Sequence, residues 1–299
     1  MGTVSDQTFL PVAPKRAGWL NVMSLFLALL LIAWHLPAIA KDPLILGVFP
    51  RRDAATSAQL FQPLASYLEQ TLGRPVTLEL SADFEVFLSN LKLRRYDIVH
   101  MNQYDYVNAH RELRYDALVQ NEEFGEKTIK GAVYVRKDSG LTQLADLKGK
   151  TILFGGGPRA MMSYIVPTYL LRKGGLDASD YEEVYAINPP NAVLATYLGR
   201  ADAGGAGEVV RRLPIVTSKI EVEQLDLIAV SEPLPHLPWA VKSEMDPEMK
   251  ARIQSLLVNL KATEEGARIL KKARLTALNP VTDSDYDAHR MIIDFINEH

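Results

Sequence analysis

The segment from residue 144 to residue 175 constrains the fold of this chain more than any other feature. It contains a short apolar run, Thr151–Phe154, which is typical of a buried strand, and three glycines follow directly. Pro158 suits the first turn of a helix, and a glycine pair at 174 and 175 suits its end. The first N–H groups of a helix lack intrahelical partners, so this order of elements predicts a site for an anion or a ligand dipole.

The first forty residues carry the pattern of an export signal. Lys15 and Arg16 precede an uncharged, leucine-rich run that ends in the small-residue pattern Ala38-Ile39-Ala40. We therefore predict a signal peptide at residues 1–40 and a periplasmic protein that begins at Lys41. The alternative is an uncleaved anchor, because about 20 apolar residues can span a bilayer. Both alternatives place the rest of the chain outside the cytoplasm.

Composition excludes several classes of function. The chain has no cysteine, which rules out disulfides, thiolate metal sites and cysteine nucleophiles. Its formal net charge is −3 and it contains no basic block, so we do not expect a nucleic-acid partner. The remaining chain of about 260 residues suffices for one large domain or two smaller lobes.

Short apolar runs alternate with segments of helical period, which is typical of βα units around a mainly parallel sheet. We expect strands at residues 44–49, 76–80, 96–101, 132–135, 151–154 and 184–186. We expect helices at residues 60–72, 84–93, 192–198, 247–260 and 264–272. The run 226–230 and the prolines after it suit a return crossing between two lobes. The prediction is an α/β chain with one lobe from 41–131 and 236–299 and a second lobe from 132–235.

Four segments resemble those of one known family: Gly47–Pro50, Val135–Gly140 with Leu144–Lys150, Ser163–Pro167 and Pro238–Lys242. Over nearly all of its length after residue 40, the chain is similar to the periplasmic solute-binding proteins of phosphate/phosphite/phosphonate (PhnD-type) ABC transporters. This resemblance implies a two-lobed type II periplasmic-binding-protein fold with two interlobe crossings. It also implies that a ligand is held between the lobes and that the lobes close on it.

The chain departs from that family at the turn that would hold an oxyanion. The family carries a Ser-Thr-Ser run there, whereas this chain has Ala160, Met161 and Met162. A hydrogen bond to a charged group contributes about 1.5–3 kcal/mol, so the loss of three hydroxyl donors predicts oxyanion binding at least about 10³-fold weaker. Backbone N–H groups remain, and Arg159 could restore one charged partner. Met101 likewise stands where the family has an aromatic residue, so we expect a ligand other than a tightly bound phosphonate.

The resemblance and these departures give a predicted ligand-binding set, which is Phe84, Met101, Asn102, Gln103, Arg159, Ala160, Met161, Met162, Ser163 and Glu208. The methionines, with His100 beside one of them, suit three alternatives: packing between lobes, a soft or polarisable solute, or a soft metal ion. Glu208 could bind a ligand amine or could favour a helix N-terminus through its dipole. Arg51 and Arg52 follow the first strand, where open α/β sheets bind ligands, although a solvated basic turn explains them too.

Two other patterns point to no separate function. Gly155, Gly157 and Ala160 match a dinucleotide fingerprint in form, but the match lies in the middle of an exported chain without a cytosolic cofactor supply. His110 and His236 fit no metal-ligand spacing, and we expect them on the surface or at a hinge.

These observations predict a binding protein without catalytic residues, metal or cofactor. We expect it to capture a small solute, either an oxyanion or a soft, polarisable molecule, and to deliver it to an inner-membrane ABC permease. The alternative is a ligand-sensing accessory protein that docks on a membrane histidine kinase or receptor. We expect a monomer.

Overall fold

The computed structural model describes residues 1–3, 8 and 42–298 of the chain. The chain divides into two units, Met1–Asp42 and Pro43–His299, and all described helices and strands lie in the second. Among the described residues, no helix has the length and apolar character needed to cross a bilayer. The predicted signal peptide or anchor falls almost wholly outside the described residues, so cleavage and anchoring both stay predictions.

The first sheet has six strands from both ends of this unit. Their spatial order is β13 (Ala277–Pro280), β4 (Tyr115–Glu122), β12 (Pro238–Lys242), β3 (Ile98–His100), β1 (Leu44–Val48) and β2 (Val76–Leu80). β1 is parallel to β2 and β3, whereas β12 is antiparallel to both β3 and β4. β4 therefore runs in the same direction as β1 and β3.

The second sheet is built from one continuous stretch of chain. Its spatial order is β10 (Leu225–Val230), β6 (Gly131–Arg136), β9 (Ala203–Gly207), β7 (Thr151–Phe154) and β8 (Glu182–Tyr185). β7 is parallel to β8 and β9, and β6 is antiparallel to β9 and β10. The predicted α/β class is confirmed, and both sheets are mixed, with parallel strands next to antiparallel return strands.

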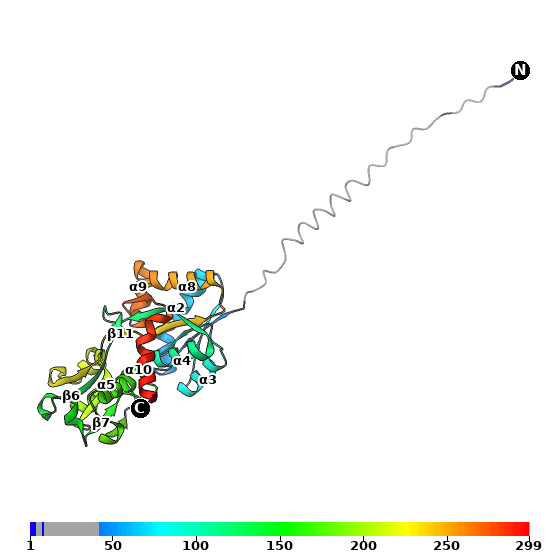
Figure 1. Cartoon of the computed structure of the whole chain (residues 1–299). Helices are drawn as coiled ribbons and strands as arrows, with labels where there is room; N and C mark the ends of the chain where they lie inside the picture. Colours follow the sequence, from blue (N-terminus) through cyan, green and yellow to red (C-terminus); the bar gives the residue numbers. More distant parts are fainter. Residues whose placement is uncertain (4–7, 9–41, 299) are drawn as a thin grey trace. The chain divides into compact units, whose positions relative to one another are not determined.

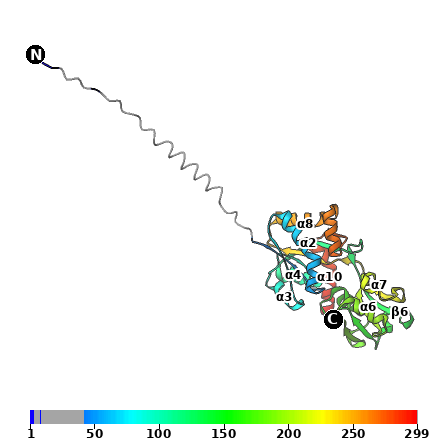
Figure 2. The same cartoon turned by 180° about the vertical axis from the view of Figure 1, so that it is seen from behind.

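Helices cover both faces of the first sheet (Figures 1 and 2). One face packs against α2 (Ala54–Leu72), α8 (Pro247–Val258) and α9 (Glu264–Ala273), and we call it the α2/α9 face. The other packs against α3 (Phe84–Lys92), α4 (Gln103–Leu113) and α10 (Asp287–Glu298), and we call it the α4/α10 face. Successive strand residues point to opposite faces, so Ile98 joins the first core and Val99 the second.

Capping, rather than the apolar stripe, sets where α2 begins. The Asp53 side chain accepts a hydrogen bond of 2.8 Å from the Thr56 N–H group, and the helix starts at Ala54. The apolar spacing predicted a start at Leu60, six residues later, because residues 54–59 are small or polar and show no periodicity. Gly73 ends the helix in the left-handed conformation with φ +62°, as expected of a glycine after a helix.

The second sheet packs closely against its helices, α5 (Val166–Lys173), α6 (Pro189–Tyr197) and α7 (Pro214–Thr217). Its central strand β9 has the sequence Ala-Gly-Gly-Ala-Gly, and all five residues are buried. A Cβ atom on Gly204 would lie 2.4 Å from Thr196 Oγ1 of α6. A Cβ atom on Gly205 would lie 2.6 Å from the Phe154 ring. The small residues of β9 therefore allow its neighbours to approach the backbone directly.

The glycine turn after β7 differs from the sequence prediction at Pro158. This proline lies in the turn rather than in a helix, so the prediction that it opens the helix was wrong. One turn of π-helix spans Met161–Ile165 instead and continues into α5. It starts there because the Ala160 carbonyl accepts hydrogen bonds from the N–H groups of Tyr164 and Ile165, at 2.8 and 3.1 Å.

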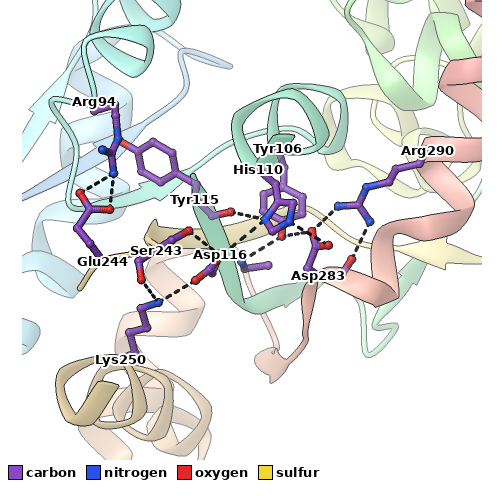
Figure 3. Close-up of polar contacts among 11 residues, drawn as sticks. Arg94, Tyr106, His110, Tyr115, Asp116, Ser243, Glu244, Lys250, Asp283 and Arg290 are labelled. Atoms are coloured by element: carbon purple, nitrogen blue, oxygen red, sulfur yellow. Dashed lines mark hydrogen bonds and ion pairs between the residues drawn. The ribbon is translucent and has the colours of Figure 1, made fainter. Parts of the chain in front are cut away.

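A network of polar side chains joins α4, α8 and α10 where β4 begins (Figure 3). His110 Nε2 lies 3.2 Å from Asp283, and its Nδ1 lies 3.7 Å from Asp116. Lys250 donates a hydrogen bond of 2.7 Å to Asp116, and Arg290 pairs with Asp283. Burial alone would raise the pKa of Asp116, but the hydrogen bonds that it accepts outweigh burial and lower it. His110 is one-third exposed, which agrees with a surface position.

Candidate functional site

Strand direction places the ends of several strands along one edge of each sheet. In the first sheet, β1, β3 and β4 end at the edge where β12 and β13 begin. In the second sheet, β7, β8 and β9 end where β6 begins. The chain crosses between these edges twice, and the crossings pair with each other as β5 (Thr128–Ile129) and β11 (Leu234–Pro235). Open α/β sheets bind ligands at such edges.

On the α4/α10 face, a buried carboxylate ties the two edges together. Arg159, in the turn after β7, donates from Nε to Asp105 Oδ1 of α4 at 3.2 Å, and from Nη2 as well. Its guanidinium carbon lies 4.9 Å from the Tyr104 ring centroid. The Asp105 side chain is 1% exposed, and burial raises its pKa although Arg159 and Asn102 act in the opposite direction. Arg159 is therefore engaged within the protein.

The three methionines of the predicted set share one apolar cluster on this face. Met101, Met161 and Met162 are 0%, 1% and 8% exposed and lie with residues of α4 and α10. Helix α10 lies against both α4 and α5 (Figures 1 and 2), and Arg172 of α5 donates a hydrogen bond of 2.8 Å to the Ile296 carbonyl. This burial fits the alternative in which the methionines fill the space between lobes.

A small pocket lies beside the two crossings and takes charged side chains from both edges. Its polar lining is Glu123, Glu126, Thr128, Lys130, Glu208, Arg212 and His236. Arg212 donates to Glu126 at 2.5 Å, and Lys130 Nζ lies 4.0 Å from Glu208. Arg211 donates a further hydrogen bond of 3.2 Å to Glu208. The predicted amine-binding Glu208 thus reaches the pocket, but two cations already accompany it.

His236 presents a neutral imidazole to this pocket. Its Nδ1 accepts a hydrogen bond of 2.8 Å from the Leu237 N–H group, so the ring hydrogen of the neutral form is on Nε2. Burial lowers the pKa of His236 to about 4, with Glu123 raising it and Arg51 lowering it by smaller amounts. The residue is 2% exposed, so the expected surface position was wrong, and its place next to β11 agrees with a hinge.

His100 and the two arginines after β1 differ in how far they are buried. His100 is buried in the sheet, where its Nδ1 donates to the Pro238 carbonyl at 3.0 Å and its ring stacks on Trp239. Burial lowers the pKa of His100 to about 3, so its ring stays neutral. His100 is also not part of the pocket lining. Arg51 is exposed and lies 3.8 Å from Glu123, whereas Arg52 is partly buried. A fully solvated basic turn therefore describes only Arg51.

The other predicted site residues take different positions. Asn102 caps α4, accepting a 2.8 Å hydrogen bond from the Asp105 N–H group. Gln103 is buried and donates to the Pro235 carbonyl in the second crossing at 3.2 Å. Ser163 is buried in the π-helical turn, and Phe84 is 44% exposed at the start of α3. The structure thus brings the methionines, Asn102, Gln103 and Arg159 together, with Phe84 and Glu208 outside that group.

Asp105 and Glu123 were missing from the predicted set. The spacing Asn102-x-x-Asp105 at a helix start is a local signal for the first, because both residues favour helix N-termini. No comparable local pattern marks Glu123. Within residues 42–298, no cluster of three or more histidine, aspartate or glutamate side chains has the geometry to hold a metal ion.

Comparison with known proteins gives a consistent picture. Residues 46–286 match the family model described as "ABC transporter, phosphonate, periplasmic substrate-binding protein". The chain is 22% identical over 276 residues to the phosphate-import protein PhnD of Mycolicibacterium smegmatis, and the match covers 85% of each chain.

Solved structures with the same fold include proteins crystallised with phosphorus-containing ligands. PhnD1 from Prochlorococcus marinus in complex with methylphosphonate has a TM-score of 0.72 and 15% identity, over 86% of this chain and 99% of that one. A Xanthomonas citri protein bound to ATP has a TM-score of 0.71 and 18% identity, over 86% and 98%. At these identities the likeness shows the fold alone, and it agrees with the predicted type II architecture.

Proposed function

Because the chain belongs to the family of periplasmic substrate-binding proteins of phosphonate ABC transporters, we propose that it captures a small solute between its two sheet edges and delivers it to an inner-membrane permease. The pocket at the crossings carries this proposal, since charged groups from both edges line it. A solute that touches both edges favours the closed arrangement, because some of its contacts exist only there. The proposal includes no catalytic step.

The proposed lobes follow the two sheets. The first sheet takes its strands from residues 44–122 and 238–280, and the second takes its strands from residues 131–230. This supports lobes at 41–131 with 236–299 and at 132–235, linked by the paired crossings. The predicted ligand-binding residues remain part of the proposal, with His236 and Glu123 added to them.

Native mass spectrometry of protein taken from its own periplasm tests solute capture. We expect an added mass that is lost when the protein unfolds, and a smaller radius of gyration when that solute is returned to the emptied protein. A periplasmic preparation that carries no solute would argue against the proposal, provided that inorganic phosphate, methylphosphonate and methanesulfonate also fail to bind.

Substitutions in the turn after β7 test whether the missing hydroxyl donors weaken oxyanion binding by this chain. Thioethers donate no hydrogen bonds, so methylphosphonate should bind the unmodified protein with a dissociation constant near or above about 10⁻⁴ M. The triple change Ala160→Ser, Met161→Thr, Met162→Ser restores hydroxyl donors and should raise the affinity measured by calorimetry. Sub-micromolar binding by the unmodified protein would show that the missing hydroxyls do not limit affinity.

The membrane partner distinguishes delivery from sensing. We propose that a monomer docks on a permease, and cross-linking in native membranes followed by mass spectrometry identifies what it contacts. Capture of permease subunits supports delivery. Capture of a histidine kinase or receptor instead supports a sensing accessory, and light scattering of the purified protein tests the monomer.

Export is a further part of the proposal. Family membership implies a periplasmic protein, and we propose that a signal peptide at residues 1–40 is removed. N-terminal sequencing of the periplasmic protein should then begin at Lys41. Recovery of the intact chain in the membrane fraction would favour the uncleaved anchor.

A further inference from the structure

Among the residues that the structure describes, the partly buried guanidinium of Arg52 has no partner. It follows β1 and precedes the Asp53 cap of α2, at the edge of the first sheet that faces the crossings. Within residues 42–298, its side chain makes neither an ion pair nor a hydrogen bond. An unpaired charge taken out of water lowers stability unless an opposite charge accompanies it. The position of Arg52 is therefore one that a bound anion would stabilise.

Two more arginines lie around Arg52, and we call Arg51, Arg52 and Arg274 the arginine cluster. Arg274 caps the end of α9, which packs against α2, and it is exposed. The chain after it is fixed at the same edge, because the Thr276 N–H group donates to the Glu122 carbonyl at the end of β4. Burial, together with the smaller effects of the Arg51 and Arg274 charges, lowers the pKa of Arg52 to about 10, while Glu123 acts in the opposite direction.

Glu123 is the described carboxylate whose charge acts on Arg52, and Arg51 already lies 3.8 Å from it. The other carboxylates at this edge bind elsewhere: Asp53 accepts hydrogen bonds from Thr56, and Glu122 accepts them from Thr276 and Asn279. Two of the three guanidinium groups thus lack a counterion of their own among the described residues. A planar guanidinium offers paired N–H donors that match an oxyanion, which is the complementary ligand.

We propose that the arginine cluster is the anion-binding part of the cleft and holds the oxyanion head group of the solute through Arg52. This inference rests on the proposed function and locates the head group on the α2/α9 face. The turn after β7 lies on the other face, where Arg159 is bound to Asp105 and the methionines are buried. Two guanidinium groups without counterions favour a dianion, such as methylphosphonate or phosphate, over the monoanion methanesulfonate.

Calorimetry at pH 8 on the full periplasmic protein tests the cluster with those three anions. Arg52→Gln should weaken methylphosphonate binding by about 10- to 100-fold, because it removes a charge-assisted contact. Arg52→Lys keeps the charge without the paired donors, so its affinity for methylphosphonate should lie between those of Arg52→Gln and the unmodified protein. The matched control is Arg268→Gln on α9, which removes one exposed arginine from the same helix as the Arg274 cap and should leave binding unchanged.

Thermal melting separates a binding role from a structural one. Methylphosphonate should raise the melting temperature of the unmodified protein and not that of Arg52→Gln. Without anion, Arg52→Gln should melt at the same temperature as the unmodified protein or higher, because the variant removes an unpaired cation beside two others. Should that variant fold poorly, Arg274→Gln at an exposed position gives the same test through weaker binding.

Equal affinities for the unmodified protein, Arg52→Gln and Arg274→Gln would overturn the inference. The absence of saturable binding of phosphate, methylphosphonate and methanesulfonate would also overturn it. Concentrations up to about 10 mM suffice for this test, because even a weak head-group contact is detectable there. Neither result contradicts the proposed function if a solute still co-purifies with the protein from the periplasm. Loss of that solute from the native preparation is the separate failure of the function itself.

Discussion

Replacing Arg159 with glutamine should destabilise the folded protein, because it removes hydrogen-bond donors from the buried Asp105 carboxylate. Asp105 is 1% exposed and would lose two donors, whereas the 2.6 Å hydrogen bond from Asn102 would remain. Leaving a buried charged acceptor short of a partner costs about 1–3 kcal/mol or more. Arg159 is 47% exposed, so water can partly replace it and the lower part of that range applies. We expect a loss of about 1–2 kcal/mol in the free energy of unfolding.

The effect of this change should depend on pH with a defined sign. Burial raises the pKa of Asp105 in the folded protein, and removal of Arg159 raises it further. A carboxyl group whose folded pKa exceeds its unfolded pKa lowers stability as pH rises through that interval. The deficit of Arg159→Gln relative to the unmodified protein should therefore be small near pH 4 and grow toward pH 7.

Urea unfolding at several pH values measures this difference. The double variant Asp105→Asn, Arg159→Gln should be as stable as Asp105→Asn alone, because the two residues act through one contact. Arg111→Gln is the matched control, since its pair with Asp294 is half exposed at both ends and should contribute less than about 0.5 kcal/mol. A midpoint for Arg159→Gln equal to that of the unmodified protein, or a deficit independent of pH, would refute the reasoning.

Two further predictions concern packing and acid stability. Gly205→Ala should destabilise the protein by about 1–3 kcal/mol in urea, because its Cβ would lie 2.6 Å from the Phe154 ring, whereas Gly157→Ala meets nothing within 4 Å and should be nearly neutral. Burial lowers the pKa values of His100, His236 and His289 to about 3, 4 and 3, so the unfolded chain binds more protons below about pH 6.5. Stability should fall between pH 6.5 and 5, by up to about 1.4 kcal/mol per pH unit for each histidine, and a flat profile there would contradict this.

Strand positions were predictable because buried strands leave a local trace. Apolar runs between turn residues predicted strands at 76–80 and 151–154, and β2 and β7 have those bounds. The start of α2 was predicted less well, since the periodic stripe begins after the helix does. Pro158 misled for a related reason: its fixed φ suits a first helical turn but equally suits a tight turn before one.

The site was less predictable because its contacts join distant residues. Arg159 and Asp105 are 54 residues apart in sequence, and the Gln120 side chain that accepts from the His236 N–H group is 116 residues away. The sequence suggested Arg159 as a contact to a ligand oxyanion, and spacing alone could not show that its guanidinium is instead bound to the buried Asp105. The burial of His236 likewise depends on the pairing of the two crossings, which no local pattern encodes.

The position of β12 has a consequence for the order in which the chain can fold as it is made. β12 pairs with both β3 and β4, so the first sheet has a gap between them until residue 242 is available. The second sheet needs only residues 131–230 and is complete before that point. A chain synthesised from its N-terminus can therefore complete the second sheet before the first, and the edges of β3 and β4 that face β12 stay unpaired until then. Delay at that stage exposes those edges to pairing with other chains, and the arrival of β12 ends the exposure.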